Sequence, residues 1–168
     1  QKNDTTQNSS SNDNRLKEVA MNLKKVLSPE DIIISLEATS KEEVIKEMVD
    51  HLYKRGKIED REAALQAILE REKKMSTGLE KGVALPHGKC EAVKELIAAI
   101  ALKREGVDFD SIDGQPAQIF IMTLSPLNRS GPHIQFLAEV TRLLKSKEKR
   151  EKILQASSKE EVLELFCS

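Results

Sequence analysis

Two runs of mostly apolar residues constrain the fold of this chain most strongly. They span Ile97–Leu102 and Gln118–Leu124, and a turn signal, Asp113-Gly114-Gln115-Pro116, lies between them. A strand with one solvated face alternates apolar and polar residues, whereas a strand covered on both faces is apolar almost throughout. The two runs therefore predict neighbouring strands of a sheet that carries helices on both faces.

The remaining segments supply the other strands and the covering helices. In chain order we expect a strand at Ile32–Ile34, a helix capped by Ser40 that ends before Gly56, a helix capped by Asp60 that runs to about Lys74, a strand that ends at Leu85, the two apolar strands, a helix opened by Pro132, a short helix near Ile153 and a helix capped by Ser158. The order β-α-α-β-β-β-α-α-α predicts an α/β fold, a three-layer α/β/α domain with a mixed central sheet.

The chain divides into a polar leader and one domain. Residues 1–14 are almost entirely Gln, Asn, Ser, Thr and Asp, which cannot bury enough apolar surface to offset the entropy of ordering. We expect residues 1–20 to be disordered, as a linker or a tag, although Arg15–Val26 has the pattern of a short helix. Residues 21–168 are expected to form a single domain with an aliphatic core, since the chain has four Phe, one Tyr and no Trp.

Composition argues against several classes of partner. The 27 Lys and Arg residues nearly balance the 28 Asp and Glu residues, and no basic run or aromatic cluster suits nucleic acid. No apolar run approaches the roughly 20 residues that a membrane-spanning helix needs. Cys90 and Cys167 fit no zinc or redox spacing, which favours a reducing, cytoplasmic location.

The stretch Gly82–Lys89 contains the first candidate for chemistry. Pro86 fixes its own φ and holds Leu85 in extended geometry, so the strand should end there and His87 should sit on a constrained turn. Gly88 removes a side chain beside the imidazole and would let another molecule approach closely. A turn histidine without a role explains the same residues equally well.

Two further residues are candidates for binding an anion. His133 follows Gly131-Pro132 in the first turn of a predicted helix, where unpaired N–H groups attract phosphate. Arg71 closes a helix shortly before the Ser76-Thr77-Gly78 turn, and its guanidinium could hold a phosphate through two hydrogen bonds. A helix cap and a solvated helix end are the plain alternatives. His51, on a helix beside apolar positions, is assigned no role.

Taken together, these motifs resemble the enzyme IIA domain of the bacterial phosphoenolpyruvate-dependent phosphotransferase system, of the fructose, mannitol and nitrogen-regulatory class. The resemblance covers about Met21 to Phe166 and is carried by Leu27-Ser28-Pro29, Ser76-Thr77-Gly78-Leu79, Val83-Ala84-Leu85-Pro86-His87-Gly88-Lys89, the stretch from Asp108 to Pro116, and Pro132-His133-Ile134 through Leu137-Ala138. It also agrees with the fold expected from the pattern of strands and helices.

The resemblance implies a role for each matched residue. His87 would be phosphorylated by the histidine phosphocarrier protein and would pass the group to a cysteine of an enzyme IIB domain, without a cofactor or metal. His133 would be the accessory histidine and Arg71 an arginine near the active site. The expected phosphate-binding set is completed by Thr77, Gly78 and Gly88. A neutral imidazole is both a nucleophile and an adequate leaving group, which suits such a relay.

Three alternatives remain at this point. A nitrogen-regulatory member of the same class would use phosphorylation of His87 to control binding to regulators or transporters. A metal site could form from His87, Cys90 and His133, although zinc usually takes four ligands, or three and water. A purely structural module would leave unexplained why a strand end and a helix start both carry a histidine.

Overall fold

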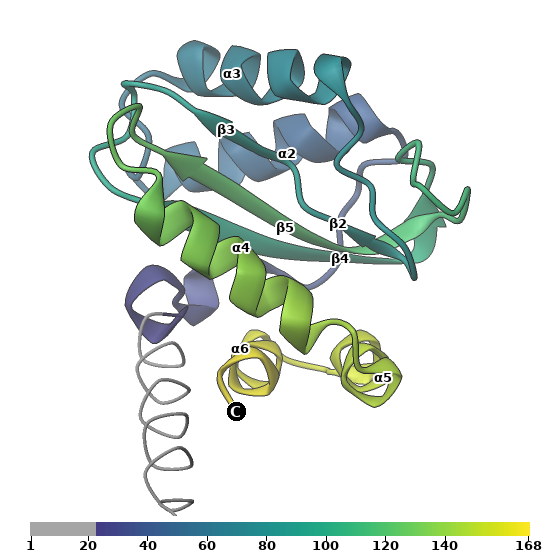
Figure 1. Ribbon diagram of the computed structural model, residues 1–168. Helices are drawn as coiled ribbons and strands as arrows, with labels where there is room; N and C mark the ends of the chain where they lie inside the picture. Colours follow the sequence, from purple (N-terminus) through teal and green to yellow (C-terminus); the bar gives the residue numbers. More distant parts are fainter. Residues whose placement is uncertain (1–22) are drawn as a thin grey trace, which may run out of the picture.

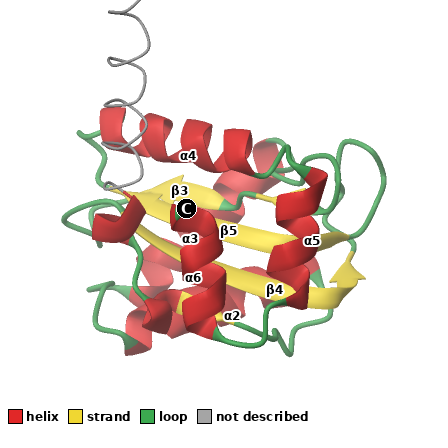
Figure 2. Cartoon of the chain, turned by 90° about the horizontal axis from the view of Figure 1, so that it is seen from below, coloured by secondary structure: helices red, strands yellow, loops and turns green. Residues whose placement is uncertain are grey.

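In the computed structural model, which describes residues 23–168, helices cover both faces of a central sheet. Two of them, α2 and α3, lie above the sheet in Figure 1, and α4, α5 and α6 lie below it. Figure 2 shows the lower layer from beneath, with the strands behind it. The predicted three-layer α/β/α arrangement is confirmed. The expected disorder of residues 1–20 concerns residues outside the described part of the chain.

The sheet is mixed, with five strands. The strands are β1 (Ile32–Ile33), β2 (Val83–Ala84), β3 (His87–Lys89), β4 (Ile97–Val107) and β5 (Ala117–Ser125). The order across the sheet is β1-β4-β5-β2, and β3 also pairs with β5. Only β4 and β5 are antiparallel to one another; β1 runs parallel to β4, and β2 and β3 run parallel to β5. The two mostly apolar runs are therefore the two central strands.

The helices begin where the capping residues predicted. They are the 3₁₀ helix η1 (Pro29–Asp31) and the α-helices α2 (Lys41–Lys54), α3 (Arg61–Lys74), α4 (Gly131–Leu143), α5 (Lys147–Gln155) and α6 (Lys159–Cys167), and residues 23–26 are also helical. The side chains of Ser40, Asp60 and Ser158 each accept the N–H group three residues later. Such caps satisfy N–H groups that the helix itself leaves unpaired.

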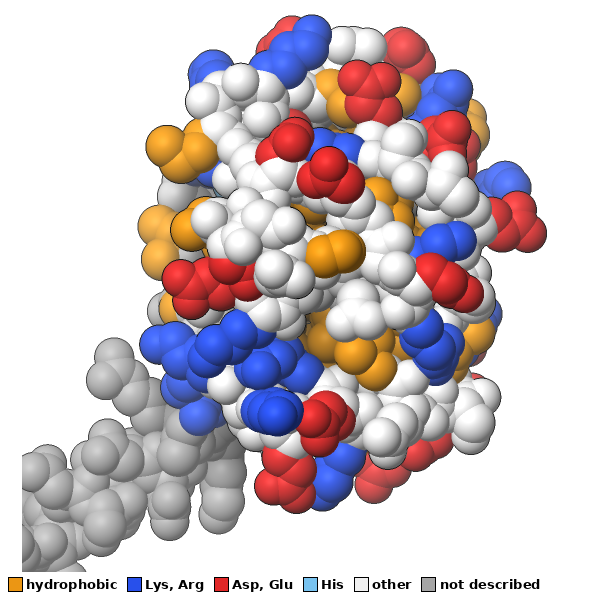
Figure 3. All heavy atoms as spheres, turned by 90° about the vertical axis from the view of Figure 1, so that its right-hand side faces the viewer, with side chains coloured by type: hydrophobic (Ala, Val, Ile, Leu, Met, Phe, Trp, Pro, Cys, Tyr) orange, Lys and Arg blue, Asp and Glu red, His pale blue; other side chains and the backbone are white. Residues whose placement is uncertain are grey.

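Two apolar cores lie on opposite faces of the sheet. Along β5, Phe120, Met122 and Leu124 face α2 and α3, whereas Ile119 and Ile121 face α4 and the C-terminal helices. Successive side chains of a strand point to opposite faces, so an apolar strand supplies both cores at once. Charged residues of both signs are interspersed on the surface that Figure 3 shows, with a group of Lys and Arg side chains in its lower part.

The structure corrects the expectation for the strand that precedes His87. Pro86 interrupts the ladder, but the chain resumes pairing at once, so His87 is the first residue of β3 and not part of a turn. Val83 pairs with Ile119 and His87 with Thr123, which is the same register on both sides of the proline. Pro86 lacks an N–H group, yet its carbonyl still accepts from Thr123. His87 therefore has a fixed place in the sheet.

Candidate active site

The pairing of β3 with β5 places four polar side chains on one face of the sheet. His87 lies opposite Thr123, and Lys89 lies opposite Ser125. Because side chains alternate along a strand, these four share the face that Ile119 and Ile121 occupy further back. The apolar pattern of that face thus changes to a polar one at the carboxyl end of β5, beside the start of α4.

The two ring nitrogens of His87 have different surroundings. Nδ1 lies 2.8 Å from the Leu85 carbonyl oxygen, which can only accept, so Nδ1 carries the proton in the neutral ring. Nε2 is left with a lone pair and makes no hydrogen bond to any residue from 23 to 168. The side chain is half-buried. The arrangement fixes the tautomer that a nucleophilic Nε2 requires.

His133 lies against His87 but is turned toward the sheet. The two ring centroids are 5.4 Å apart, with an angle of 65° between the planes. Nε2 of His133 lies 2.8 Å from the Thr123 hydroxyl, and Nδ1 lies 3.4 Å from the Ser125 hydroxyl. The ring is buried, and both of its nitrogens therefore have partners within the protein.

Two positively charged side chains, Arg71 and Lys89, lie near the His87 ring. Nη1 of Arg71, in the last turn of α3, donates to the Met75 carbonyl at 2.7 Å, which holds the guanidinium at the end of the helix. The other guanidinium nitrogens make no hydrogen bond within residues 23–168. Lys89 donates to the Ser130 hydroxyl at 2.7 Å and so connects β3 with the start of α4. Both cations lie near enough to His87 for their charges to lower its pKa.

Both histidines are held neutral. Burial lowers the pKa of His87 most, and the charges of Arg71 and Lys89 lower it further, while the bond to Leu85 and the charge of Glu72 oppose these effects. Burial also lowers the pKa of His133, to about 4, with smaller contributions from His87 and Lys89. Near pH 7 the site therefore offers an uncharged imidazole beside two cations.

Neighbouring parts of the fold pack closely against the threonine and glycine candidates, Thr77, Gly78 and Gly88. The Thr77 side chain is buried and bonded to Glu72. A Cβ on Gly78 would lie 2.8 Å from the Phe109 carbonyl, so this glycine permits the segment after β4 to approach closely. A Cβ on Gly88 would lie 3.1 Å from backbone atoms of Ala67 and Ile68 in α3. The expectation that Gly88 admits another molecule is thus wrong, because the closely approaching group is α3.

The three residues of the alternative metal site, His87, Cys90 and His133, do not assemble. Cys90 packs in the core between the sheet and helices α2 and α3, whereas His87 and His133 lie on the opposite face. Within residues 23–168 no group of three His, Cys, Asp or Glu side chains is arranged to hold a metal ion. The site is therefore a histidine pair with cations around it.

The sequence interpretation missed several residues that shape the site. Thr123 and Ser125 orient His133, Lys89 adds a charge, and the Leu85 carbonyl fixes the His87 tautomer. A signal was present, since Thr123 and Ser125 are polar residues two apart at the end of an apolar strand.

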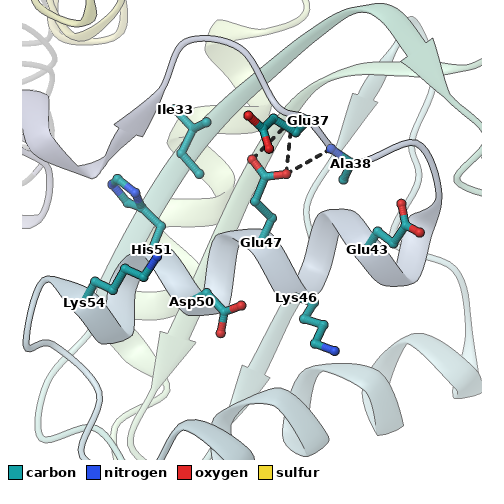
Figure 4. Close-up of a pocket in the computed structure, with 9 residues that line it drawn as sticks. All are labelled: Ile33, Glu37, Ala38, Glu43, Lys46, Glu47, Asp50, His51 and Lys54. Atoms are coloured by element: carbon teal, nitrogen blue, oxygen red, sulfur yellow. Dashed lines mark hydrogen bonds between the residues drawn. The ribbon is translucent and has the colours of Figure 1, made fainter.

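A separate hollow of about 460 Å³ lies along α2, away from both histidines of the site. Figure 4 shows acidic and basic side chains around it, with the Glu47 carboxylate accepting the N–H groups of Glu37 and Ala38. His51 borders this hollow, and its Nε2 lies 2.6 Å from the Glu30 carbonyl. That contact joins α2 to η1.

With this geometry established, comparison with known proteins defines the family. The sequence pattern described as "Phosphoenolpyruvate-dependent sugar phosphotransferase system, EIIA 2" matches residues 25–168. The chain belongs to this family. It is a phosphotransfer component of the EIIA class, as the arrangement of motifs indicated.

Two curated relatives that differ in length match most of this chain. The fructose-specific EIIA component of Haloferax volcanii is 39% identical over 137 residues, which cover 80% of this chain and 89% of that protein. The fructose-specific EIIABC component of Bacillus subtilis is 36% identical over 146 residues, 87% of this chain. This chain spans only 23% of the length of that Bacillus protein.

Solved structures share the fold. The nitrogen regulatory protein IIA-Ntr of Neisseria meningitidis has a TM-score of 0.79 and 32% identity, covering 84% of this chain and 97% of that one. The mannitol enzyme IIA of Escherichia coli, in a complex with phosphorylated enzyme IIB, has a TM-score of 0.72 and 31% identity, covering 83% and 96%. Within residues 23–168, no helix has the length and apolar character to cross a membrane.

Proposed function

We propose that this chain accepts a phosphoryl group on Nε2 of His87 from the histidine phosphocarrier protein and passes it to a cysteine of an enzyme IIB domain. The observation that carries the proposal is the 2.8 Å contact between Nδ1 and the Leu85 carbonyl, which leaves Nε2 as the nucleophilic nitrogen. Family membership supports phosphoryl transfer as the chemistry. The proposed partners imply a cytoplasmic location.

The transfer itself requires one bond to form and one to break. The Nε2 lone pair attacks phosphorus as the bond to the donor imidazole breaks, and the donor ring keeps that electron pair. The phosphorylated His87 ring is then a cation as long as Nδ1 keeps its proton. The Leu85 carbonyl stabilises that N–H group, and the positive ring makes the N–P bond easier to break in the next transfer.

Arg71, Lys89 and His133 assist in different ways. The transferring group is negatively charged, so catalysis depends on positioning and on positive groups near its oxygens. Arg71 and Lys89 supply charge, and Arg71 has guanidinium N–H groups to donate. His133 packs against the nucleophile as a neutral ring. Its contact with Ser125, at 3.4 Å, is the longer of its two and the one we assign to exchange for a phosphoryl oxygen.

The enzyme IIB acceptor is supported by a relative. The solved complex of mannitol enzyme IIA with phosphorylated enzyme IIB pairs a chain of the same fold with such a domain. A regulatory role is the second candidate, favoured by the TM-score of 0.79 to the Neisseria nitrogen regulatory protein. In that role, phosphorylation of His87 would change binding to a regulator or transporter.

Intact-mass measurement tests the proposal. The protein is incubated with phosphoenolpyruvate, the histidine phosphocarrier protein and the enzyme that phosphorylates that carrier, then analysed at mildly alkaline pH, where phosphohistidine survives. We expect one phosphoryl group on the wild type and on His51→Gln, none on His87→Gln, and uptake slower by about tenfold for His133→Gln. Uptake by His87→Gln would contradict the proposal.

Onward transfer separates the two candidate functions. The phosphorylated protein is mixed with an enzyme IIB domain, and the mass of both chains is followed. Movement of the group to the IIB cysteine supports the sugar-uptake role. Retention on His87 with every IIB domain offered would favour the regulatory role.

A further inference from the structure

A buried carboxylate near the end of α3, Glu72, has so far been described only for its effect on the pKa of His87. The Glu72 side chain is only 4% exposed. Its Oε1 accepts the Thr77 N–H at 2.8 Å and lies 2.6 Å from Nζ of Lys41, and its Oε2 accepts the Thr77 hydroxyl. A buried charge is costly unless it is paired and hydrogen-bonded. Glu72 meets both conditions, through Lys41 and Thr77.

Lys41 connects this carboxylate to other parts of the fold. It is the first residue of α2. Its Nζ also lies 3.5 Å from the Phe109 carbonyl, 3.4 Å from an Asp110 carboxylate oxygen and 5.1 Å from the centre of the Phe109 ring. The Lys41–Glu72 pair therefore joins the start of α2, the end of α3 and the segment after β4.

Contacts continue from Thr77 to the nucleophile. The Thr77 carbonyl accepts the Leu85 N–H at 3.0 Å. The Leu85 carbonyl is in turn the acceptor for Nδ1 of His87, at 2.8 Å. Both backbone polar groups of Leu85 are thus used, one to hold the strand to the Thr77 turn and one to orient the imidazole. An unbroken series of polar contacts runs from Lys41 to His87.

We infer that Glu72, held by Lys41, is a positioning residue that fixes the tautomer and orientation of His87 through Thr77 and Leu85. The inference deepens the proposed function and rests on it for its effect on phosphoryl transfer. Its effect on the ring tautomer does not depend on any transfer. Without Glu72 the Thr77 turn loses two of its hydrogen bonds, and Leu85 loses a fixed partner. Nδ1 of His87 would then lose a well-placed acceptor.

Replacement by an amide tests the role of the carboxylate. Glu72→Gln keeps the size of the side chain but introduces an N–H₂ group, so it cannot accept from Lys41 and from both Thr77 donors. Nitrogen-15 NMR of the histidines reports which ring nitrogen is protonated. We expect the wild type to show protonated Nδ1 on His87, and Glu72→Gln to show a mixture of both tautomers. We expect phosphoryl uptake to slow by about tenfold, as for other small misplacements of a reacting group.

Asp31→Asn is the matched control. Asp31 is also a fully buried carboxylate, and it pairs with Lys57 at 2.7 Å, but its contacts involve Ser28, Arg55 and Lys57 and do not lead to His87. This variant should lose comparable stability while the His87 tautomer and the uptake rate stay within about twofold of the wild type. Equal changes in both variants would mean that Glu72 acts only through stability and would overturn the inference.

Two further variants keep the test decisive if Glu72→Gln fails to fold. Thr77→Val removes the hydroxyl that bonds to Glu72, and Lys41→Met removes the charge partner. Either one should shift the His87 tautomer in the same direction. An unchanged tautomer in both would overturn the inference. If the wild type takes up no phosphoryl group, the proposed function fails, but the tautomer measurements still decide the positioning role.

Discussion

The two faces of β3 differ sharply, although the strand has only three residues. On one face, Gly88 lets the backbone of α3 approach so closely that a Cβ would lie 3.1 Å from it. On the other face, the His87 ring lies edge-on against the His133 ring. The residue of β5 that pairs with His87 is the polar Thr123. The close contact with α3 fixes the position of the strand, and that position fixes the place of the His87 ring on the polar face.

The largest loss of stability should come from disturbing the face of β3 on which Gly88 contacts α3. Gly88→Val places a branched side chain against the backbone of α3, and we expect unfolding free energy to fall by about 3 kcal/mol, the cost typical of overpacking. Urea denaturation measures it. Gly131→Val is the control, because a Cβ at Gly131 has nothing within 4 Å. Equal stability of the two variants would mean that α3 can move away from residue 88 at little cost, and would contradict this expectation.

The second largest loss of stability should come from acidification, which protonates the histidines on the polar face of β3. The pKa of His133 is about 4 in the folded protein, below its ordinary value of 6.5. A depressed histidine pKa means that the unfolded chain binds the proton more tightly, so stability is complete above pH 6.5 and is lost as the pH falls toward 4. His87 titrates in the same direction.

Denaturation at pH 7.5, 5.5 and 4.5 checks this expectation, with His133→Gln as the comparison. That variant should lose less stability over the interval than the wild type does. Burial raises the pKa of Asp31, but its bonds to Lys57 and Ser28 outweigh burial and hold the pKa below its ordinary 3.8. Its stabilising contribution is therefore constant over this interval and is lost only at lower pH. An unchanged pH dependence in His133→Gln would argue that the ring is not buried in its neutral form.

A smaller loss should follow from removing one hydroxyl beneath His133. Thr123 is fully buried and its hydroxyl lies 2.8 Å from Nε2. Thr123→Val keeps the shape but leaves that nitrogen without a partner, so we expect a loss of about 1–2 kcal/mol in unfolding free energy. Thr141→Val, which removes a hydroxyl bonded only to the Leu137 carbonyl, should cost less than about 0.5 kcal/mol. The same denaturation assay ranks the pair, and the reverse order would be inconsistent with this geometry.

The smallest effect should come from the link between β3 and α4. Lys89→Met removes the contact with Ser130 and one positive charge near His87. The pKa of His87 should rise slightly, as followed by NMR, and phosphoryl uptake should slow by about threefold, since an exposed charge contributes modestly. A fall in the pKa would mean that Lys89 acts on the ring in some other way.

Sequence patterns predicted the layers and most elements for local reasons. The caps Ser40, Asp60 and Ser158 each start a helix, and the apolar pattern of β4 and β5 requires cover on both faces. His87, His133 and Arg71 stood out because each lies at the end or beginning of an expected element. The error at Pro86 arose because a proline removes one donor but does not prevent the next residues from pairing again in the same register.

The linear sequence by itself determined that this chain forms a covered α/β sheet and that it belongs to a family of phosphotransfer components. The tertiary structure decided which atoms meet at the candidate site and which ring nitrogen is left with a lone pair. The free nitrogen of His87 follows from the position of the Leu85 carbonyl, the orientation of His133 from two hydroxyls of β5, and the role of Gly88 from the approach of α3. Each of these geometries depends on how a strand pairs or a helix packs in the folded chain, and local sequence patterns do not encode such distances.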